Sequence, residues 1–314
     1  MDLVFCGTPR FAVPTLERLV GTGFHVQLVV TQPDKPRGRG LELAASPVKQ
    51  CAMTLGLPIT QPDKIKKNEE FQAQLAELNP EAIIVVGYGR IIPQWMIDLP
   101  RFGNLNLHAS LLPKYRGAAP IQWAIASGET VTGVTIMRID AGLDTGDILQ
   151  QRETPVADDD TAETLSLRLA AIGATLMVET LRGLQAATMV AVPQDHSLAS
   201  LAPILKKEDG LIDFRRPAQQ ICDRLRGFQP WPGGFTSFRG KGLGVGLVRS
   251  FMAAVEGAGE PGSVTITGDH LLVECGAGTQ LELLEVQPEG KKRMAARDFV
   301  HGYHPRTGDR LGVL

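Results

Sequence analysis

The chain has 314 residues and a formal net charge of −2, and 43% of its residues are hydrophobic and 21% charged. This composition is that of an ordinary soluble globular protein, and the length suffices for about two domains. A net charge of −2 excludes a protein that binds nucleic acid through a strongly basic overall charge. There is no continuous apolar run of the roughly 20 residues that span a membrane and no basic signal region, so we expect a cytoplasmic protein without a membrane partner.

The cysteines and histidines give no sign of a disulfide framework or a metal centre. The four cysteines lie far apart and form no CxxC pair, and the six histidines show no ligand spacing such as HExxH. We therefore expect reduced thiols and no metal.

The N-terminal residues predict a βαβ unit. A short apolar strand at residues 3–6 is followed by a helical pattern at 14–20 and a second strand at 25–31, with glycines between them. This order favours a parallel sheet. The first turn, at residues 7–10, lacks the GxGxxG of a dinucleotide-binding turn, so NAD binding is not expected.

The next stretch, residues 32–40, is rich in proline and glycine, which break both helical and strand periods, so we expect no regular element there. Its cations Lys35, Arg37 and Arg39 follow the end of a strand, where α/β sheets bind ligands. Two interpretations stay open: a solvated loop, and a loop that contacts phosphates.

A continuous apolar run at residues 81–86 predicts a central parallel strand that is buried on both faces. It leads into Gly87 and Gly89, whose missing side chains would let a planar ligand approach the backbone. A tight strand-to-helix turn explains the same glycines. Surface helices are predicted at residues 47–55 and 71–78.

Residues 104–108 read as a strand in which Asn106 and His108 alternate with apolar leucines, so both polar side chains lie on one face. An amide donor beside a group that titrates near neutrality suits acyl transfer, because a developing oxyanion needs a donor and an attacking amine must lose a proton. Asp144, in a glycine-punctuated loop, is the expected third member.

The remaining pattern predicts a short helix at residues 120–126, strands at 131–138 and 148–156, and a long amphipathic helix at 162–184. We expect an α/β first domain, residues 1–187, with a Rossmann-like parallel sheet flanked by helices. An ordered linker, 188–207, and a small OB-like β-barrel, 208–314, follow. The predicted barrel strands are 235–238, 244–251, 263–267, 270–275 and 280–287, after a helix at 217–226. From Lys206 onward, 15 Lys and Arg against 13 Asp and Glu permit a polyanionic partner.

These residues resemble the folate-dependent formyltransferases. The resemblance rests on four stretches, residues 5–12, 106–113, 116–121 and 140–147, among which Asn-x-His, Ser-Leu-Leu-Pro and the later Asp-Thr-Gly are specific to the formyltransferase domain. It continues through residues 207–210 and 230–233 to the C-terminus. The second domain is the kind found in members that act on tRNA.

The resemblance implies that a formyl group passes from 10-formyltetrahydrofolate to the α-amino group of methionine on initiator tRNA, without a metal. Asn106, His108 and Asp144 would be catalytic: Asn106 would donate to the oxyanion, and His108, polarised by Asp144, would donate to it or relay a proton. The pocket for the folate would be formed by Gly87, Tyr88, Gly89, Arg90, Ile91, Ile92, Ser110, Leu111, Leu112, Pro113, Asp140, Ala141, Gly142 and Leu143.

The same resemblance implies contacts with tRNA through Lys35, Arg37 and Arg39 in the basic loop, Lys206 and Lys207 at the end of the linker, and Lys291, Lys292 and Arg293 in the barrel. This chain departs from the pattern at Leu41, Glu42 and Leu43, where further basic residues are expected. The loop would therefore contact tRNA more weakly or through apolar packing. We expect a monomer.

Three alternatives remain. A formyltransferase that acts on an amino-sugar nucleotide shares the catalytic motifs. A non-catalytic RNA-binding protein explains the cations and leaves Asn106, His108 and Asp144 unexplained. A formyl-folate hydrolase would release formate without an amine acceptor.

Overall fold

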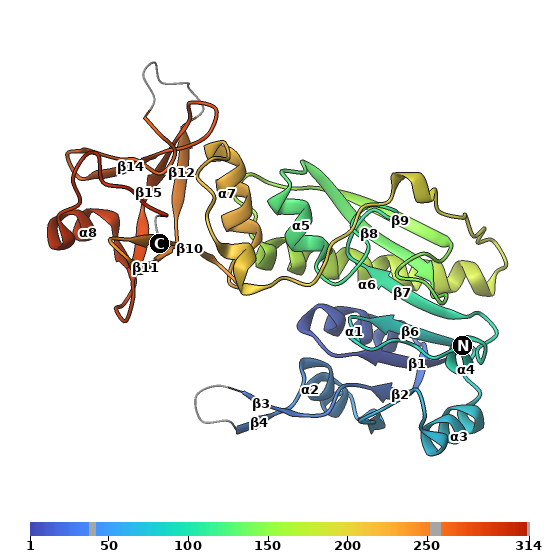
Figure 1. Ribbon diagram of the computed structural model, residues 1–314. Coiled ribbons are helices and arrows are strands. Elements are labelled where there is room, and N and C mark those ends of the chain that lie inside the picture. Colours follow the sequence, from blue (N-terminus) through green and yellow to red (C-terminus); the bar gives the residue numbers. More distant parts are fainter. Residues whose placement is uncertain (38–41, 252–258, 313–314) are drawn as a thin grey trace. The chain divides into compact units, whose positions relative to one another are not determined.

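The computed structural model describes residues 1–37, 42–251 and 259–312 (Figure 1). The chain divides into two compact units. The first contains Met1–Pro120, Val131–Pro155 and Ser166–Pro203, and the second contains Ile121–Thr130, Val156–Leu165 and Ile204–Leu314.

A seven-stranded sheet forms the centre of the first unit, in the order β5-β2-β1-β6-β7-β8-β9. The first five strands in this order are parallel, as the βαβ start predicted, whereas β8 and β9 are antiparallel to their neighbours. The strand β9 lies at an edge of the sheet, because it pairs only with β8 there. The strands are β1 (Asp2–Gly7), β2 (His25–Val30), β5 (Ile59–Thr60), β6 (Ala82–Val86), β7 (Asn104–His108), β8 (Val131–Arg138) and β9 (Ile148–Pro155).

Helices cover both faces of this sheet. All five residues of β6 are buried, as expected for a central strand. On one face, β-strand side chains share a core with α3 (Glu69–Leu78) and α4 (Gln94–Ile97). On the other face, Gly173 of α6 (Ala162–Gln185) is in close contact with Leu107, because a Cβ at this glycine would lie 2.6 Å from the leucine side chain.

The helix α6 is 24 residues long and is the one described helix with the length and composition to cross a membrane. Its apolar window is 56% buried inside the protein, which is the behaviour of a core helix. Its first turn is capped, since Thr161 Oγ1 accepts from the Thr164 N–H at 3.3 Å. A surface groove between α6 and α1 (Val13–Gly21) is lined by residues of both helices.

The prediction of no regular element at residues 32–40 was wrong. Lys35–Arg37 forms the strand β3, which pairs antiparallel with β4 (Glu42–Ala44). Proline is tolerated here because a two-stranded ribbon has free edges, so the missing N–H of Pro36 breaks no ladder. Ser46 then caps α2 (Pro47–Thr54) by accepting from the Lys49 N–H.

The second unit is built on two four-stranded antiparallel sheets, in the orders β10-β11-β16-β17 and β12-β15-β14-β13. Two of the five predicted strands are each divided in two, at residues 246–247 and at 284, where the chain passes from one sheet to the other. The strands are β10 (Gly234–Phe238), β11 (Lys241–Val245), β12 (Val248–Phe251), β13 (Val264–Thr267), β14 (His270–Glu274), β15 (Gln280–Leu283), β16 (Glu285–Pro288) and β17 (Met294–Ala295).

Three helices complete the second unit. The helices α7 (Ala218–Gly227) and α8 (Ala296–Tyr303) contribute Ile221, Leu225 and Phe299 to the apolar core. The helix α5 (Pro120–Ala126), which precedes β8 in the chain, packs on α7. Gly227 permits this packing, because a Cβ there would lie 2.8 Å from the Gln122 carbonyl.

Candidate active site

The strand β7 carries two of the predicted catalytic residues. Asn106 is half-buried and pairs with Val85 of β6 and Met137 of β8. His108 ends the strand with 6% of its surface exposed. Strand alternation places both side chains on one face, opposite the buried Leu105 and Leu107, as the sequence predicted.

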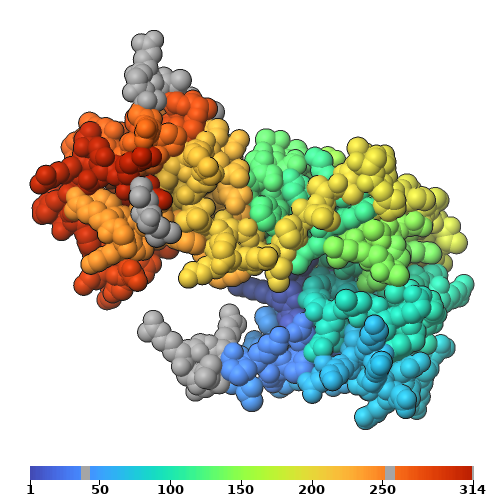
Figure 2. Space-filling model, in the orientation of Figure 1, coloured from blue at the N-terminus to red at the C-terminus, as the bar shows by residue number. Residues whose placement is uncertain are grey.

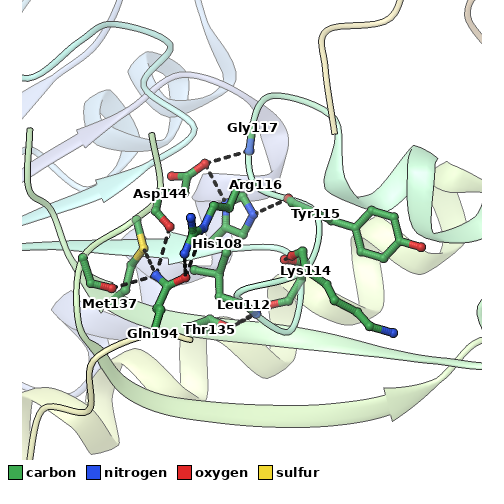
Figure 3. A network of polar contacts seen from close by, with 12 residues as sticks. His108, Leu112, Lys114, Tyr115, Arg116, Gly117, Thr135, Met137, Asp144 and Gln194 are labelled. Carbon is green, nitrogen blue, oxygen red and sulfur yellow. Dashed lines mark hydrogen bonds and ion pairs between the residues drawn. The ribbon is translucent and has the colours of Figure 1, made fainter. Parts of the chain in front are cut away.

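His108 is held between two loops (Figure 3). Its Nε2 lies 2.9 Å from the Tyr115 carbonyl oxygen, and its Nδ1 lies 3.7 Å from Asp144 Oδ2. Because a carbonyl only accepts, Nε2 carries a proton in this arrangement, and the neutral ring has its lone pair on Nδ1, facing the carboxylate. The structure thus brings His108 and Asp144 together from strand and loop.

Asp144 lies in the loop between β8 and β9 with φ +51°, a backbone conformation that residues other than glycine adopt rarely. Its Oδ2 accepts from the Gly117 N–H at 2.8 Å. Earlier in the loop, Asp140 Oδ1 accepts from the Gly142 N–H at 3.0 Å and the Thr145 hydroxyl at 2.7 Å. These bonds close the turn that presents Asp144 to His108.

Two buried hydroxyl groups hold residues 110–113, which were predicted to line the folate pocket. Thr135 Oγ1 donates to the Ser110 carbonyl at 2.6 Å and accepts from the Leu112 N–H at 3.1 Å. Ser110 Oγ donates to the Lys114 carbonyl at 2.6 Å. Leu112 is buried, whereas Leu111 and Pro113 are half-buried. Hydrogen bonds within the protein therefore fix the backbone of residues 110–113.

The predicted folate loop, residues 87–92, follows β6 directly. Gly87 and Gly89 have φ of +56° and +75°, so the turn places both residues in the left-handed region that favours glycine. A Cβ at Gly87 would lie 2.8 Å from Pro9, so protein packs on this glycine. The Tyr88 side chain lies in the core, whereas 90% of Ile91 is exposed.

The remaining members of the predicted folate set differ in exposure. Arg90 Nη1 donates to the Asp63 carbonyl at 2.5 Å, and Ile92 belongs to the core. Ala141 and Gly142 are exposed, and 61% of Leu143 is exposed. The two loops therefore offer the apolar side chains of Ile91 and Leu143 to a ligand.

The cations predicted to contact tRNA lie on both units. In the first unit, Lys35 Nζ donates to Gln32 Oε1 at 3.0 Å, and the backbone of Arg37 lies in β3. Arg39 lies outside the described residues. In the second unit the exposed candidates are Lys206, Lys207, Lys291, Lys292 and Arg293, of which Arg293 lies 3.8 Å from Glu285.

The structure also reveals two buried polar residues that sequence reasoning did not assign. Arg116 and Gln194 are 7% and 6% exposed, and the guanidinium donates to the amide oxygen at 2.6 Å. Gln194 lies in the segment predicted as a linker, which pairs with the first unit through Val192 and Leu201. In Figure 2 this segment, in yellow, lies on the surface of the green part of the first unit. The sequence signal for Gln194 was the polar turn at residues 193–197, and that for Arg116 was the stretch 116–121 that carries the family resemblance.

Among the residues that the structure describes, no group of three or more His, Cys, Asp or Glu side chains could hold a metal ion. The site places an amide donor, an imidazole and a carboxylate at the end of a buried strand. These groups suit acyl transfer, which needs a donor to an oxyanion and a group that accepts a proton.

Comparison with known families defines the class. Residues 2–181 match the family described as formyl transferase, and residues 204–304 match the formyl transferase C-terminal domain. Fold and site thus define a formyl transferase with both of its domains.

Full-length relatives narrow this class. The methionyl-tRNA formyltransferase of Koribacter versatilis is 65% identical over 314 residues, which are 100% of this chain and 99% of that protein. The methionyl-tRNA formyltransferase of Geobacter metallireducens is 48% identical, with 99% of each chain covered. The chain belongs to the methionyl-tRNA formyltransferase family.

The fold is shared with more distant solved structures. An N-formyltransferase from Helicobacter canadensis, in complex with folinic acid and dTDP-3-aminofucose, has a TM-score of 0.68 at 18% identity and covers 91% of this chain and 98% of its own. The sugar 3N-formyl transferase WlaRD has a TM-score of 0.67 at 19% identity and covers 93% of this chain and 99% of its own.

Proposed function

We propose that this protein transfers the formyl group of 10-formyltetrahydrofolate to the α-amino group of methionine on initiator tRNA, as a monomer in the cytoplasm. The observation that carries the proposal is similarity along the whole chain, second unit included, to methionyl-tRNA formyltransferases at 65% identity. The pairing of His108 with Asp144 at 3.7 Å beside Asn106 supports it chemically.

In the reaction the neutral amine attacks the formyl carbon and forms a C–N bond, and the former carbonyl oxygen becomes an oxyanion. Asn106 donates its amide N–H to this oxygen. The intermediate then collapses: the bond from the carbon to N10 of the folate breaks, N10 takes a proton, and tetrahydrofolate leaves. The amine proton is lost in the same sequence, so the balance needs a group that accepts and returns one proton.

His108 fills this role. Its Nδ1 faces the Asp144 carboxylate, so a proton taken up at Nδ1 lies between the imidazole and the carboxylate, whose negative charge stabilises the imidazolium. The Tyr115 carbonyl holds Nε2 and fixes the orientation of the ring. Donation from an imidazolium to the oxyanion is the alternative role for the same ring.

For the folate, we propose that residues 87–92, 110–113 and 140–143 form the pocket. Its support is that the 87–92 loop follows β6 beside the C-terminal end of β7, and that the loop containing residues 140–143 returns to the same end, where Asp144 lies 3.7 Å from His108. Ile91 and Leu143 are exposed on these loops. Apolar surface beside backbone polar groups suits a flat heterocycle that carries hydrogen-bonding edges.

For the tRNA, we propose that residues 1–187 carry catalysis and that residues 208–314 contact the nucleic acid, with 188–207 joining them. Lys35, Arg37 and Arg39 would contact the acceptor end. Lys206, Lys207, Lys291, Lys292 and Arg293 would contact the backbone, since exposed cations position phosphates without reading sequence.

The test is formyl transfer from 10-formyltetrahydrofolate to methionine-charged initiator tRNA, with uncharged tRNA and an amino-sugar nucleotide as parallel acceptors. We expect transfer to the charged initiator alone. Transfer to the sugar alone would retain the catalytic residues and reject the role assigned to the cations. Formate release without any acceptor would identify a hydrolase.

A further inference from the structure

Gln194 joins two loops of the candidate site (Figure 3). Its Nε2 donates to the backbone carbonyls of Asp144 at 2.9 Å and Gly146 at 2.7 Å. Its Oε1 accepts from Arg116 Nη2 at 2.6 Å and Nε at 3.2 Å. Only 6% of the residue is exposed, so water does not replace these bonds freely.

Every hydrogen-bonding group of the Gln194 side-chain amide has a partner, and these partners fix its orientation. A glutamine side chain has two N–H donors and one carbonyl acceptor, and each of these groups has a partner here. The reversed amide would set its N–H groups against the Arg116 guanidinium and its oxygen against two carbonyls. No other uncharged side chain of this length offers both a donor pair and an acceptor.

The two loops joined by Gln194 are the ones that hold the reacting groups. Arg116 stands between Tyr115, whose carbonyl faces His108 Nε2, and Gly117, whose N–H donates to Asp144 Oδ2. Asp144 has φ +51°, so its loop needs outside contacts to keep the carboxylate in place.

We propose that Gln194 is a positioning residue: it fixes the Asp144 loop against the residue 115–117 loop, and so keeps the Asp144 carboxylate facing His108. The inference rests on the proposed function for its kinetic consequence. It also assigns the segment after α6 a part in assembling the active site.

Two substitutions separate this role from mere support of Arg116. Gln194→Met removes all the amide bonds at similar volume. Gln194→Glu keeps an acceptor for Arg116 but sets a carboxylate oxygen against the carbonyls of Asp144 and Gly146. We expect both variants to lose kcat about 100-fold, the cost of a displaced catalytic group, with KM for charged tRNA near the wild-type value. Wild-type kcat in Gln194→Glu with a loss in Gln194→Met would overturn the proposal.

A double-mutant cycle with Asp144→Asn tests whether Gln194 acts through Asp144. If it does, Gln194→Met costs little further activity once the carboxylate is gone. Fully multiplicative losses would mean that Gln194 contributes independently, and the proposal would be wrong. Gln150→Leu is the matched control, because Gln150 Oε1 accepts from the hydroxyl of Thr180, a residue of α6 in the same unit, at 2.8 Å.

Hydrogen exchange gives a readout independent of activity. Backbone amides of residues 140–147 should exchange faster in both Gln194 variants than in the wild type and in Gln150→Leu. Unchanged exchange in this loop would overturn the positioning role whatever the kinetics. If the wild type transferred no formyl group and the Gln194 variants still exchanged faster than the wild type, the proposed function would be contradicted and the positioning role would stand.

Discussion

Asp144 Oδ2 lies 3.7 Å from His108 Nδ1 while the same oxygen accepts from the Gly117 N–H at 2.8 Å. The carboxylate is therefore held by a backbone amide and directed at an imidazole that is fixed on its other side by Tyr115. Two loops and one strand end converge on this contact, and the proposed chemistry depends on it.

Asp144→Asn should lower kcat about 100-fold or more, because the amide keeps an oxygen for Gly117 and loses the negative charge that faces His108. Single-turnover formyl transfer measures this directly. The control is Glu179→Gln, which removes a carboxylate paired with Arg152 at 2.8 Å on the surface of the same unit. Equal rates for Asp144→Asn and Glu179→Gln would mean that the Asp144 charge has no part in catalysis.

Asn106→Ala should lower kcat about 100-fold to 1,000-fold with the fold retained, because removing an oxyanion donor costs transition-state stabilisation. Asn104 is the matched comparison on the same strand: its Nδ2 donates to the Met96 carbonyl at 2.7 Å inside the core. Asn104→Ala should lower the free energy of unfolding by about 1 to 3 kcal/mol and leave kcat per folded molecule near wild type.

Thermal unfolding and single-turnover rates, measured on both variants, distinguish the two asparagines. If Asn106→Ala unfolded as readily as Asn104→Ala and kept its rate when folded, Asn106 would be structural.

Local patterns predicted the parts of this protein that are set by neighbouring residues. The apolar run of β6 and the alternation of β7 gave the central strand and the common face of Asn106 and His108. The divided barrel strands were not foreseen, because the corner at Leu247 depends on its carbonyl accepting from Leu284 and Glu285, far along the chain. The role of Gln194 was missed for the same reason, since its partners lie 48 to 78 residues away.

The four cysteines should react slowly with thiol reagents in the native protein. Burial raises the pKa of Cys51 and Cys222 to about 11 and of Cys275 to about 12, and places that of Cys6 higher still. The thiols therefore stay neutral at pH 7 to 8, and the thiolate is the reactive form. Titration with a chromogenic disulfide should show slow reaction of all four before denaturant and fast reaction after it.

These raised pKa values also set a direction for stability. Because the neutral thiol is favoured in the folded state, the thiols contribute to the free energy of unfolding. This contribution is complete below the unfolded pKa of about 8.5 and declines as pH rises toward 11. Unfolding by urea at pH 8 and pH 10 measures the decline, and a Cys222→Ser variant should show a smaller one. Fast native labelling of Cys222 at pH 8 would contradict the burial that the structure shows.

Replacing Lys35, Arg37 and Arg39 together by alanine should weaken use of charged tRNA far more than use of the folate. Each cation–phosphate pair that the substitutions remove should reduce the slope of log K against log salt by about 0.7 to 0.9, because fewer counterions are released on binding. Alanine at Lys64, Lys66 and Lys67 is the charge-matched control, since these lysines are exposed on the same unit outside β3 and β4. A salt slope that stays at its wild-type value in the Lys35, Arg37 and Arg39 variant would exclude these three cations from tRNA binding, and would leave Lys291, Lys292 and Arg293 of the second unit as the phosphate-binding residues to test next.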